Sequence, residues 1–362
     1  MPQIPLYDKC IAKKQPSYHS GLWFNKFFDA YESDWKPIEG EKGKAKWLQQ
    51  FQGQHGGTMQ VGDYAERQRA LVSLLGGDTL AMKTQWHFVT GMGNNHPVEN
   101  GFAWHPTLGV PYLTGAAVKG LLRAWCEEWD KKDDATLALW FGSRNDKSPS
   151  AGALIFFDAV PTKPVTLKVD VMTPHYGKWY EKGDQKPEED GSNIPADWHS
   201  PVPIPFLVVD KNQSFQFSIS KRETCVAQQI ELSVVMKELE SALEWIGAGA
   251  KTAVGYGQMR SEESIHKQKE QENELKAKAI EGRAFSWLSE TLKDLREDKD
   301  LSALPEADLW KKSLATRWQL APKELKPILL EEIKKEWIKL GIKWGAPEGG
   351  SARNAKNIYS RG

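Results

Sequence analysis

A helical repeat of apolar residues covers positions 230–246 of the chain. The apolar positions are three or four residues apart, as on one face of an α-helix, and they are Leu232, Val235, Met236, Leu239, Leu243 and Ile246. Gly247 follows directly, where a helix end often needs a residue with positive φ. Residues 252–259 are predicted to form a short strand. The expected order is therefore helix, glycine-rich loop and strand.

The chain before this helix alternates between strand-like and helical patterns. A helix is predicted to start at Thr114 or Gly115 and to end at Trp129, and its apolar stripe consists of Val118, Leu121, Leu122 and Trp125. Strands are predicted over residues 80–90, 153–159, 166–171, 205–209 and 215–220. The last two are expected to pair through a turn that begins at Asp210. This order indicates an α+β fold of the ferredoxin-like type, an antiparallel sheet backed by two helices, over residues 79–260.

An N-terminal extension over residues 1–78 precedes this body. A short helix that packs its aromatic residues is predicted over residues 22–31. A second helix is predicted over residues 64–75, with Asp63 as its N-cap and Gly76-Gly77 as its stop.

Two polar segments are expected to lack regular structure. Residues 37–62 contain a proline, several glycines and three lysines, which indicates a loop or mobile arm with a short helix around Trp47. The lysines of this arm form either a solvated surface or an RNA contact, and they are Lys42, Lys44 and Lys46. Residues 177–203 form a long insertion that is rich in acidic residues and prolines, for which poor order is expected.

The chain changes character after position 260. Residues 262–281 are dense in Glu, Lys and Gln, which is typical of a solvated helix or a linker. Within a helical C-terminal extension over residues 261–345, further helices are predicted at 285–295, 307–318 and 326–340. Pro327 is expected in the first turn of the last helix, because an interior proline would break it. The tail, residues 346–362, is expected to be disordered.

Charge and cysteine usage narrow the class of protein. Equal numbers of basic and acidic side chains give a net charge of zero, so nucleic acid can be bound only through a local patch. The three cysteines form no CxxC pair, which indicates neither a zinc site nor a disulfide framework; they are Cys10, Cys126 and Cys225. A cytoplasmic protein is expected, since no signal peptide and no bilayer-spanning apolar stretch are visible.

The glycine-rich segment after the helix allows two interpretations. Lys251 and Thr252 resemble the end of a nucleotide phosphate loop, but Ala250 stands where that motif needs glycine. The segment also follows a helix C-terminus, whereas phosphates are bound at helix N-termini. It is therefore either a turn that lets backbones pack closely or a cradle for an RNA backbone. Gly249, Gly255 and Gly257 are expected where the backbone meets RNA or a packed neighbour.

Four blocks of sequence resemble the RAMP superfamily of RNA-binding CRISPR subunits. Gly247-Ala-Gly-Ala-Lys-Thr-Ala-Val-Gly-Tyr-Gly257 is similar to the family's C-terminal glycine-rich loop. Gly109-Val-Pro-Tyr-Leu-Thr-Gly-Ala-Ala-Val-Lys-Gly-Leu-Leu-Arg123 resembles its Pro-x-Ile-Pro-Gly-Ser-Ser-x-Lys-Gly-x-x-Arg signature, with Thr114 for the second proline and Ala116-Ala117 for the two serines. Phe156-Phe-Asp-Ala-Val-Pro161 and Asp170-Val-Met-Thr-Pro-His-Tyr176 point to the sixth subunit of the type III-B (Cmr) complex. The resemblance covers about half of the chain.

This resemblance implies a ferredoxin-like fold and a non-catalytic subunit. Since no metal-ligand spacing is visible in the sequence, no metal or cofactor is expected. The resemblance also implies guide crRNA, bound toward its 3′ end, and other Cmr-complex subunits as partners, with target RNA met only indirectly. Lys119 and Arg123 are four residues apart, so they share a helix face that either grips successive phosphates or forms surface salt bridges. The candidate RNA-binding residues are Lys119, Arg123, His175, Tyr176, Gly247, Gly249, Lys251, Thr252, Gly255, Tyr256 and Gly257.

Two enzymatic alternatives stay open. A guide-processing endoribonuclease would use His175 as a general base, although no second base stands at a suitable spacing. A repeated backbone subunit would cut target RNA with Asp158 or Asp170, but these residues are instead expected to bond loop N–H groups or basic side chains. His96 and His105 match no established metal-binding spacing. The 16 tryptophans are expected mostly in cores and interfaces, although aromatic residues also stack on single-stranded RNA.

Overall fold

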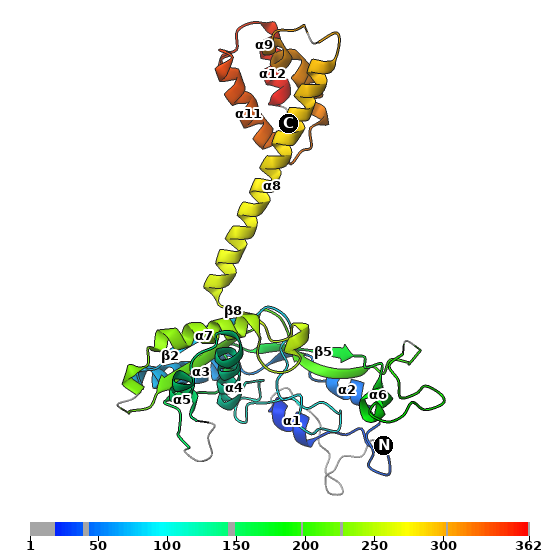
Figure 1. Ribbon diagram of the computed structural model, residues 1–362, viewed down its shortest axis with the longest axis vertical. Coiled ribbons are helices and arrows are strands. Elements are labelled where there is room, and N and C mark those ends of the chain that lie inside the picture. The colour runs from blue at the N-terminus through cyan, green and yellow to red at the C-terminus, as the bar shows by residue number, and fades with distance from the viewer. Residues whose placement is uncertain are drawn as a thin grey trace. The chain divides into compact units, whose positions relative to one another are not determined.

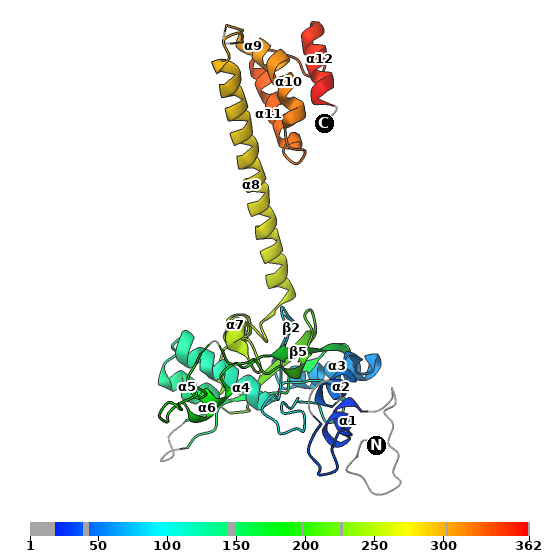
Figure 2. The same ribbon diagram turned by 90° about the vertical axis from the view of Figure 1, so that its right-hand side faces the viewer.

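The computed structural model describes residues 19–38, 43–143, 149–196, 198–224, 227–301 and 303–360. It forms two compact units, residues 1–264 and 265–362, each with its own hydrophobic core. Figures 1 and 2 show the chain in two views. Cys10, Cys225 and Lys42 lie outside the described residues. Within the described part, no helix combines the length and apolar character needed to cross a bilayer.

The first unit mixes helices with short antiparallel strands. Its elements are α1 (Ser20–Lys26), α2 (Lys44–Gln49), β1 (Gly53–His55), α3 (Thr58–Leu74), β2 (Asp78–Thr84), α4 (Gly115–Ala124), the π-helical turn η2 (Trp125–Trp129), α5 (Asp134–Phe141), β3 (Leu154–Phe156), β4 (Val160–Pro161), β5 (Val165–Met172), α6 (Gly177–Lys182), β6 (Ile204–Val209), β7 (Ser214–Lys221), η3 (Ala227–Gln229), α7 (Leu232–Trp245), η4 (Thr252–Val254) and β8 (Met259–Arg260). The α+β class is confirmed, whereas the ferredoxin-like topology stays a prediction.

The strands form two sheets. One has the order β3-β7-β2-β8, with β4 also paired to β7, and the other has the order β1-β5-β6. The predicted pairing of residues 205–209 with 215–220 is therefore wrong. Both edges of β7 are taken, by β2 on one side and by β3 and β4 on the other, so β6 pairs with β5 instead.

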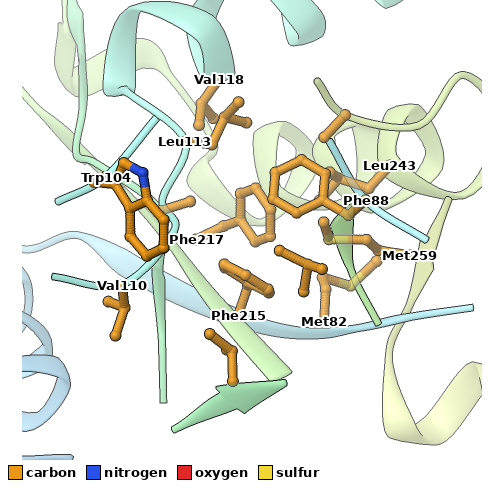
Figure 3. Packing of buried hydrophobic residues seen from close by; sticks show 14 of the residues in the cluster. Met82, Phe88, Trp104, Val110, Leu113, Val118, Phe215, Phe217, Leu243 and Met259 are labelled. Atoms are coloured by element: carbon orange, nitrogen blue, oxygen red, sulfur yellow. The ribbon is translucent and has the colours of Figure 1, made fainter. Parts of the chain in front are cut away.

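Residues 85–90 cross from one sheet to the other. The predicted strand 80–90 ends at Thr84, and Phe88 then bridges to Val209 of β6. Figure 3 shows Phe88 packed with Met82, Phe215 and Leu243 in the main core. Apolar side chains of both sheets, α4 and α7 meet there, and their burial fixes this crossing segment in place.

The N-terminal segment is more ordered than its composition predicts. The expectation of a mobile arm is wrong for residues 43–62, because Trp47, Leu48 and Phe51 are almost fully buried and anchor α2 and β1. Lys44 is buried as well and pairs with Glu99 at 2.6 Å. Of the arm's described lysines, Lys46 alone is exposed.

The helix expected at 64–75 begins earlier than predicted. It starts at Thr58, and Gly57 rather than Asp63 is its N-cap residue. The predicted stop is confirmed, since Gly76 follows the helix with a φ of +60°. β1 lies just before this helix and pairs with β5, so the N-terminal segment contributes a strand to the body.

The acidic insertion and the end of the glycine segment also differ from expectation. Residues 177–203 contain α6 and a turn closed by the buried Asn193, whose side chain accepts from the Glu188 N–H and donates to the Lys186 carbonyl. Of the strand predicted at 252–259, only Met259 is in a strand, as the first residue of β8, because positive φ angles at Gly255 and Gly257 do not suit a strand.

The second unit is helical. It consists of most of α8 (Glu262–Glu297), α9 (Glu306–Asp308), the π-helical turn η5 (Leu309–Ser313), α10 (Leu314–Arg317), η6 (Trp318–Leu320), α11 (Lys326–Lys339) and α12 (Gly350–Tyr359). Pro327 lies in the first turn of α11, as predicted. The expectation of a disordered tail is wrong for residues 350–359, because Tyr359 of α12 is buried against Trp318 and Trp337 and donates to the Trp310 carbonyl.

Candidate nucleic-acid interface

The glycine loop, residues 247–257, begins where α7 ends. Gly247 has a φ of +80°, which confirms the predicted positive angle, and its N–H donates to the Ala242 carbonyl of the last helical turn at 3.1 Å. Only glycine adopts this conformation without strain from a Cβ atom. The apolar stripe of α7 is buried as predicted at Val235, Met236, Leu239 and Leu243.

Two other glycines of the loop allow the backbone to pack against itself. A Cβ atom on Gly249 would lie 2.0 Å from the Val89 carbonyl oxygen, and one on Gly257 would lie 1.9 Å from the Ala248 carbonyl oxygen. Gly255 differs, because a Cβ atom there meets no other atom within 4 Å. Gly249 and Gly257 therefore contact a packed neighbour within the chain, while Gly255 faces open space.

Backbone hydrogen bonds tie the loop to the crossing segment 85–90. The Ala250 N–H donates to the Val89 carbonyl at 2.9 Å, and the Gly257 N–H donates to the His87 carbonyl at 2.7 Å. A third bond, from Ala248 to Gly257 at 2.9 Å, closes the base of the loop. The loop is thus a fixed structure and not a flexible connection.

Lys251 lies at the centre of the loop in a left-handed conformation, with a φ of +61°. This region costs a residue with a Cβ atom about 1 kcal/mol. Its ammonium group lies 3.4 Å from the Met172 sulfur and 5.4 Å from the centre of the Phe206 ring. No carboxylate of the described residues pairs with this charge. A cation that is fixed, half-buried and unneutralised is well suited to contact a phosphate.

A polar network supports the loop from the β5–β6 side. The Tyr256 hydroxyl donates to Asp170 Oδ2 at 2.6 Å, and His87 Nδ1 lies 3.2 Å from the same oxygen. His87 Nε2 faces Asp210 at 3.6 Å, and the other oxygen of Asp210 lies 2.9 Å from the Lys168 ammonium. The loop, the crossing segment and the second sheet are therefore joined by side chains as well as by backbone bonds.

Ionisation strengthens these bonds at neutral pH. Burial would raise the pKa of Asp170, but hydrogen bonds from Tyr256, the Val171 N–H and His87 hold it below its usual value. Burial and the bond to Asp170 raise the pKa of Tyr256 to about 12. Burial would also raise the pKa of Asp210, but the bond from Lys168 keeps it lowered. Two carboxylates thus stay charged while Tyr256 keeps its proton, which gives charge-assisted hydrogen bonds.

Lys119 and Arg123 lie on α4, which begins at Gly115, one of the two predicted starts, with Thr114 as its N-cap. Arg123 is engaged within the chain, because its Nε donates to Glu127 at 2.7 Å and its guanidinium lies 6.0 Å from the Phe141 ring centre. For Lys119 the described residues provide no ion pair or hydrogen bond, and none joins either cation to the glycine loop. The structure therefore does not bring these two cations into the loop network.

The remaining candidates are Thr252, His175 and Tyr176. Thr252 is half-buried and starts η4, where its carbonyl accepts from the Gly255 N–H. His175 is exposed and Tyr176 half-exposed, three to four residues beyond Met172, and their rings lie 6.2 Å apart. Met172 contacts Lys251, so chain continuity keeps both aromatic residues near this end of the loop.

Four of the residues weighed for catalysis or metal binding have structural partners: Asp158, Asp170, His96 and His105. Asp158 accepts the Gly115 N–H at the start of α4 (2.7 Å), as expected for a carboxylate that bonds a loop N–H. Asp170 bonds Tyr256 and His87 rather than Lys or Arg. His96 lies 2.8 Å from the Phe24 carbonyl, and His105 Nδ1 accepts two backbone N–H groups.

Sequence reasoning missed Trp86, His87, Lys168 and Asp210. All four were placed in or beside predicted strands, where alternation explains them as ordinary surface or core positions. Their roles depend on residues 85–90 passing between the two sheets, and no local pattern shows that crossing. The Trp86-His87 pair inside the predicted strand 80–90 was the one available signal.

Comparison with known proteins identifies the family. The RAMP superfamily model matches residues 77–260, more than half of the chain. The CRISPR system Cmr subunit Cmr6 of Pyrococcus furiosus is 26% identical over 260 residues, which cover 54% of this chain and 70% of that protein. The Cmr6 subunit of Saccharolobus solfataricus is 28% identical over 163 residues, which cover 44% of this chain and 47% of that protein.

Solved structures of CRISPR complexes and subunits are also similar. The cryo-EM structure of the type III-B Cmr-beta bound to cognate target RNA matches with a TM-score of 0.44 and 20% identity, over 62% of this chain and 77% of that one. The crystal structure of Cmr6 from Pyrococcus furiosus matches with a TM-score of 0.30 and 23% identity, over 51% of this chain and 97% of that one. The family match confirms the resemblance seen in the four sequence blocks: the chain belongs to the RAMP superfamily, and it is similar to the Cmr6 subunits of CRISPR systems.

Proposed function

We propose that this chain is a non-catalytic RNA-binding subunit of a type III-B CRISPR effector. In this proposal it binds the 3′ part of the guide crRNA, caps the backbone subunits, contacts other Cmr subunits and meets target RNA only indirectly. The family membership and the similarity to Cmr6 proteins support the effector assignment. Residues 79–260 would form the RAMP domain, with the glycine loop at its RNA-binding face.

The observation that carries the RNA-binding proposal is the state of Lys251. Its backbone is held in a costly left-handed conformation by the Ala250 and Gly257 hydrogen bonds, and its charge has no carboxylate partner among the described residues. Strain of this kind persists where the surrounding structure imposes it, often at ligand-binding sites. A phosphate contact by one fixed lysine is independent of base sequence, which a guide-carrying subunit needs.

The contacts of the two candidate histidine bases support a non-catalytic role. His175 has no hydrogen bond or ion pair with another described residue. The ring nitrogens of His87 both face carboxylates, so the ring is occupied in a structural network. Incubating the purified chain with repeat-containing RNA should give no discrete product, and a product that disappears with His175→Ala would establish the endoribonuclease alternative.

Titration of labelled single-stranded RNA with the full-length chain tests the phosphate contact. Lys251→Asn removes the charge with a residue that tolerates the left-handed region. We expect about 5- to 10-fold weaker binding for every sequence and a salt slope smaller by about 0.7, the value for one contact to a single strand. Lys131→Asn is the matched control, because Lys131 is also left-handed, with a φ of +54°. Equal affinities for the two variants would contradict the proposal.

A further inference from the structure

Trp86 is an exposed indole in the segment that is bonded to the glycine loop. About 49% of its surface is exposed. The backbone on either side of it is fixed, because the Gln85 N–H donates to the Gln258 carbonyl at 2.8 Å and the Gly257 N–H donates to the His87 carbonyl at 2.7 Å. The position of this side chain is therefore set by the same bonds that shape the loop.

The indole rests on a rigid support. It stacks on the His87 imidazole with ring centres 4.8 Å apart and planes inclined by 25°. The imidazole is itself oriented by Asp170 and Asp210, which face its two nitrogens. An indole that stacks on a ring held from both edges loses little further freedom when a ligand binds, which favours affinity.

The charges around this support do not repel a polyanion strongly. Of the two carboxylates behind the imidazole, Asp210 is paired with Lys168 at 2.9 Å, and Asp170 accepts bonds from Tyr256 and His87. Lys251 provides an unpaired positive charge in the loop that His87 and Tyr256 support. A base near the indole and a phosphate near Lys251 would thus meet complementary groups.

We infer that Trp86 is a stacking platform for an unpaired nucleobase of the bound RNA. The inference rests on the proposed function and adds a base contact to the phosphate contact of Lys251. Stacking on an aromatic ring accepts every base, since each has a π-face, but its strength varies with the base. The platform therefore suits a guide of variable sequence, and a larger purine ring should stack on it more strongly than a pyrimidine.

The test compares full-length variants in their binding to oligo(A), oligo(U) and a fully paired RNA duplex. Trp86→Ala should weaken oligo(A) binding about 5- to 100-fold, the range for loss of one stacked base. Oligo(U) binding should fall less and duplex binding should not change, because paired bases cannot stack on the indole. The salt slope should stay at the wild-type value, since no charge is removed, and Trp86→Phe should restore most of the affinity.

Trp129→Ala is the matched control. Trp129 is also exposed, at 63%, and it also stacks on a ring, with its centre 6.0 Å from that of Trp125. Its removal should leave binding of all three RNAs unchanged. An equal loss in both tryptophan variants would overturn the inference.

The remaining outcomes separate the platform from the proposed function. Normal oligo(A) binding by Trp86→Ala, together with weak binding by Lys251→Asn, would reject the platform and keep the phosphate contact. If Trp86→Ala binds oligo(A) normally but fails to join the assembled complex, the platform is rejected and Trp86 is an anchor for a protein partner. Equal losses on single-stranded and duplex RNA, with a lower melting temperature, would show a structural role and reject the platform. No RNA binding by the wild-type chain would reject both proposals.

Discussion

Lys251 in the glycine loop and Arg123 on α4 are both cations placed near an aromatic ring, yet their surroundings differ. Arg123 lies in a regular helix, where Glu127 one turn later neutralises it at 2.7 Å. Lys251 lies in a strained loop and faces the Met172 sulfur and the Phe206 ring instead of a carboxylate. Positive charge alone therefore does not mark an RNA contact. Whether a carboxylate lies beside the cation decides if its charge remains available to a phosphate.

The largest expected effect concerns the backbone of the loop. Gly249→Val should lower the free energy of unfolding by about 3 kcal/mol or more, because Gly249 has a φ of +84° and a Cβ atom would overlap the Val89 carbonyl oxygen. The sequence leaves open whether Gly249 meets RNA or a packed neighbour, and the contact with Val89 supports the packed neighbour. Thermal unfolding of the purified variant measures the effect.

Two other glycine substitutions calibrate this result. Gly255→Ala should cost only about 1 kcal/mol, since its φ of +89° is unfavourable but the space is open. Gly120→Ala should be neutral or stabilising, because Gly120 lies inside α4 and a Cβ atom there meets nothing within 4 Å. Equal losses at Gly249 and Gly255 would mean that backbone angle, not packing, dominates the loop.

The loop and α4 also show what a sequence reveals. The helix α7, the positive φ of Gly247 and a start of α4 at Thr114 or Gly115 follow from local period and capping, and the structure agrees with all three. The sequence indicates that the backbone at Gly249 is closely approached by another group. It does not show that this group is Val89, because the two residues are distant in sequence. The same limit explains the wrong pairing of β6 with β7, since a short polar turn between strands is typical of a hairpin.

Buried apolar residues indicate which polar segments are ordered better than overall composition does. The arm around Trp47 and the tail around Tyr359 are both rich in Gly, Lys or Asn, which favours disorder. Each nevertheless contains aromatic residues that are buried, at 1% exposure for Trp47 and for Tyr359. A few large apolar side chains were enough to order these polar segments.

A further prediction uses pH to disrupt the hydrogen bonds that Asp170 accepts from Tyr256 and His87. The folded pKa of Asp170 is lowered, so its stabilising contribution is present above the unfolded pKa of about 3.9 and is lost as pH falls through the folded value. Asp170→Asn should therefore have a lower melting temperature than the wild type at pH 7, and the difference should become smaller as pH falls through the folded pKa of Asp170. A constant difference from pH 7 to 2.5 would contradict this linkage.

The smallest effects are expected on α4, and they sharpen the comparison of the two cations. Arg123→Ala should lower the free energy of unfolding by up to about 1 kcal/mol, because it removes the ion pair with the half-buried Glu127 and the contact with Phe141. Its RNA affinity should change less than that of Lys251→Asn. Lys119→Ala should leave stability unchanged, since no described residue pairs with Lys119.

The RNA affinity of these α4 variants decides whether the helix face belongs to the interface. If Lys119 touches a phosphate, Lys119→Ala should weaken binding about two- to threefold and lower the salt slope, while Arg123→Ala should not. Equal losses of affinity and slope in both single variants would mean that Arg123 exchanges Glu127 for phosphate when RNA binds. In that case an ion pair in the free protein would be no sign that a cation is structural, and the contrast with Lys251 would fail.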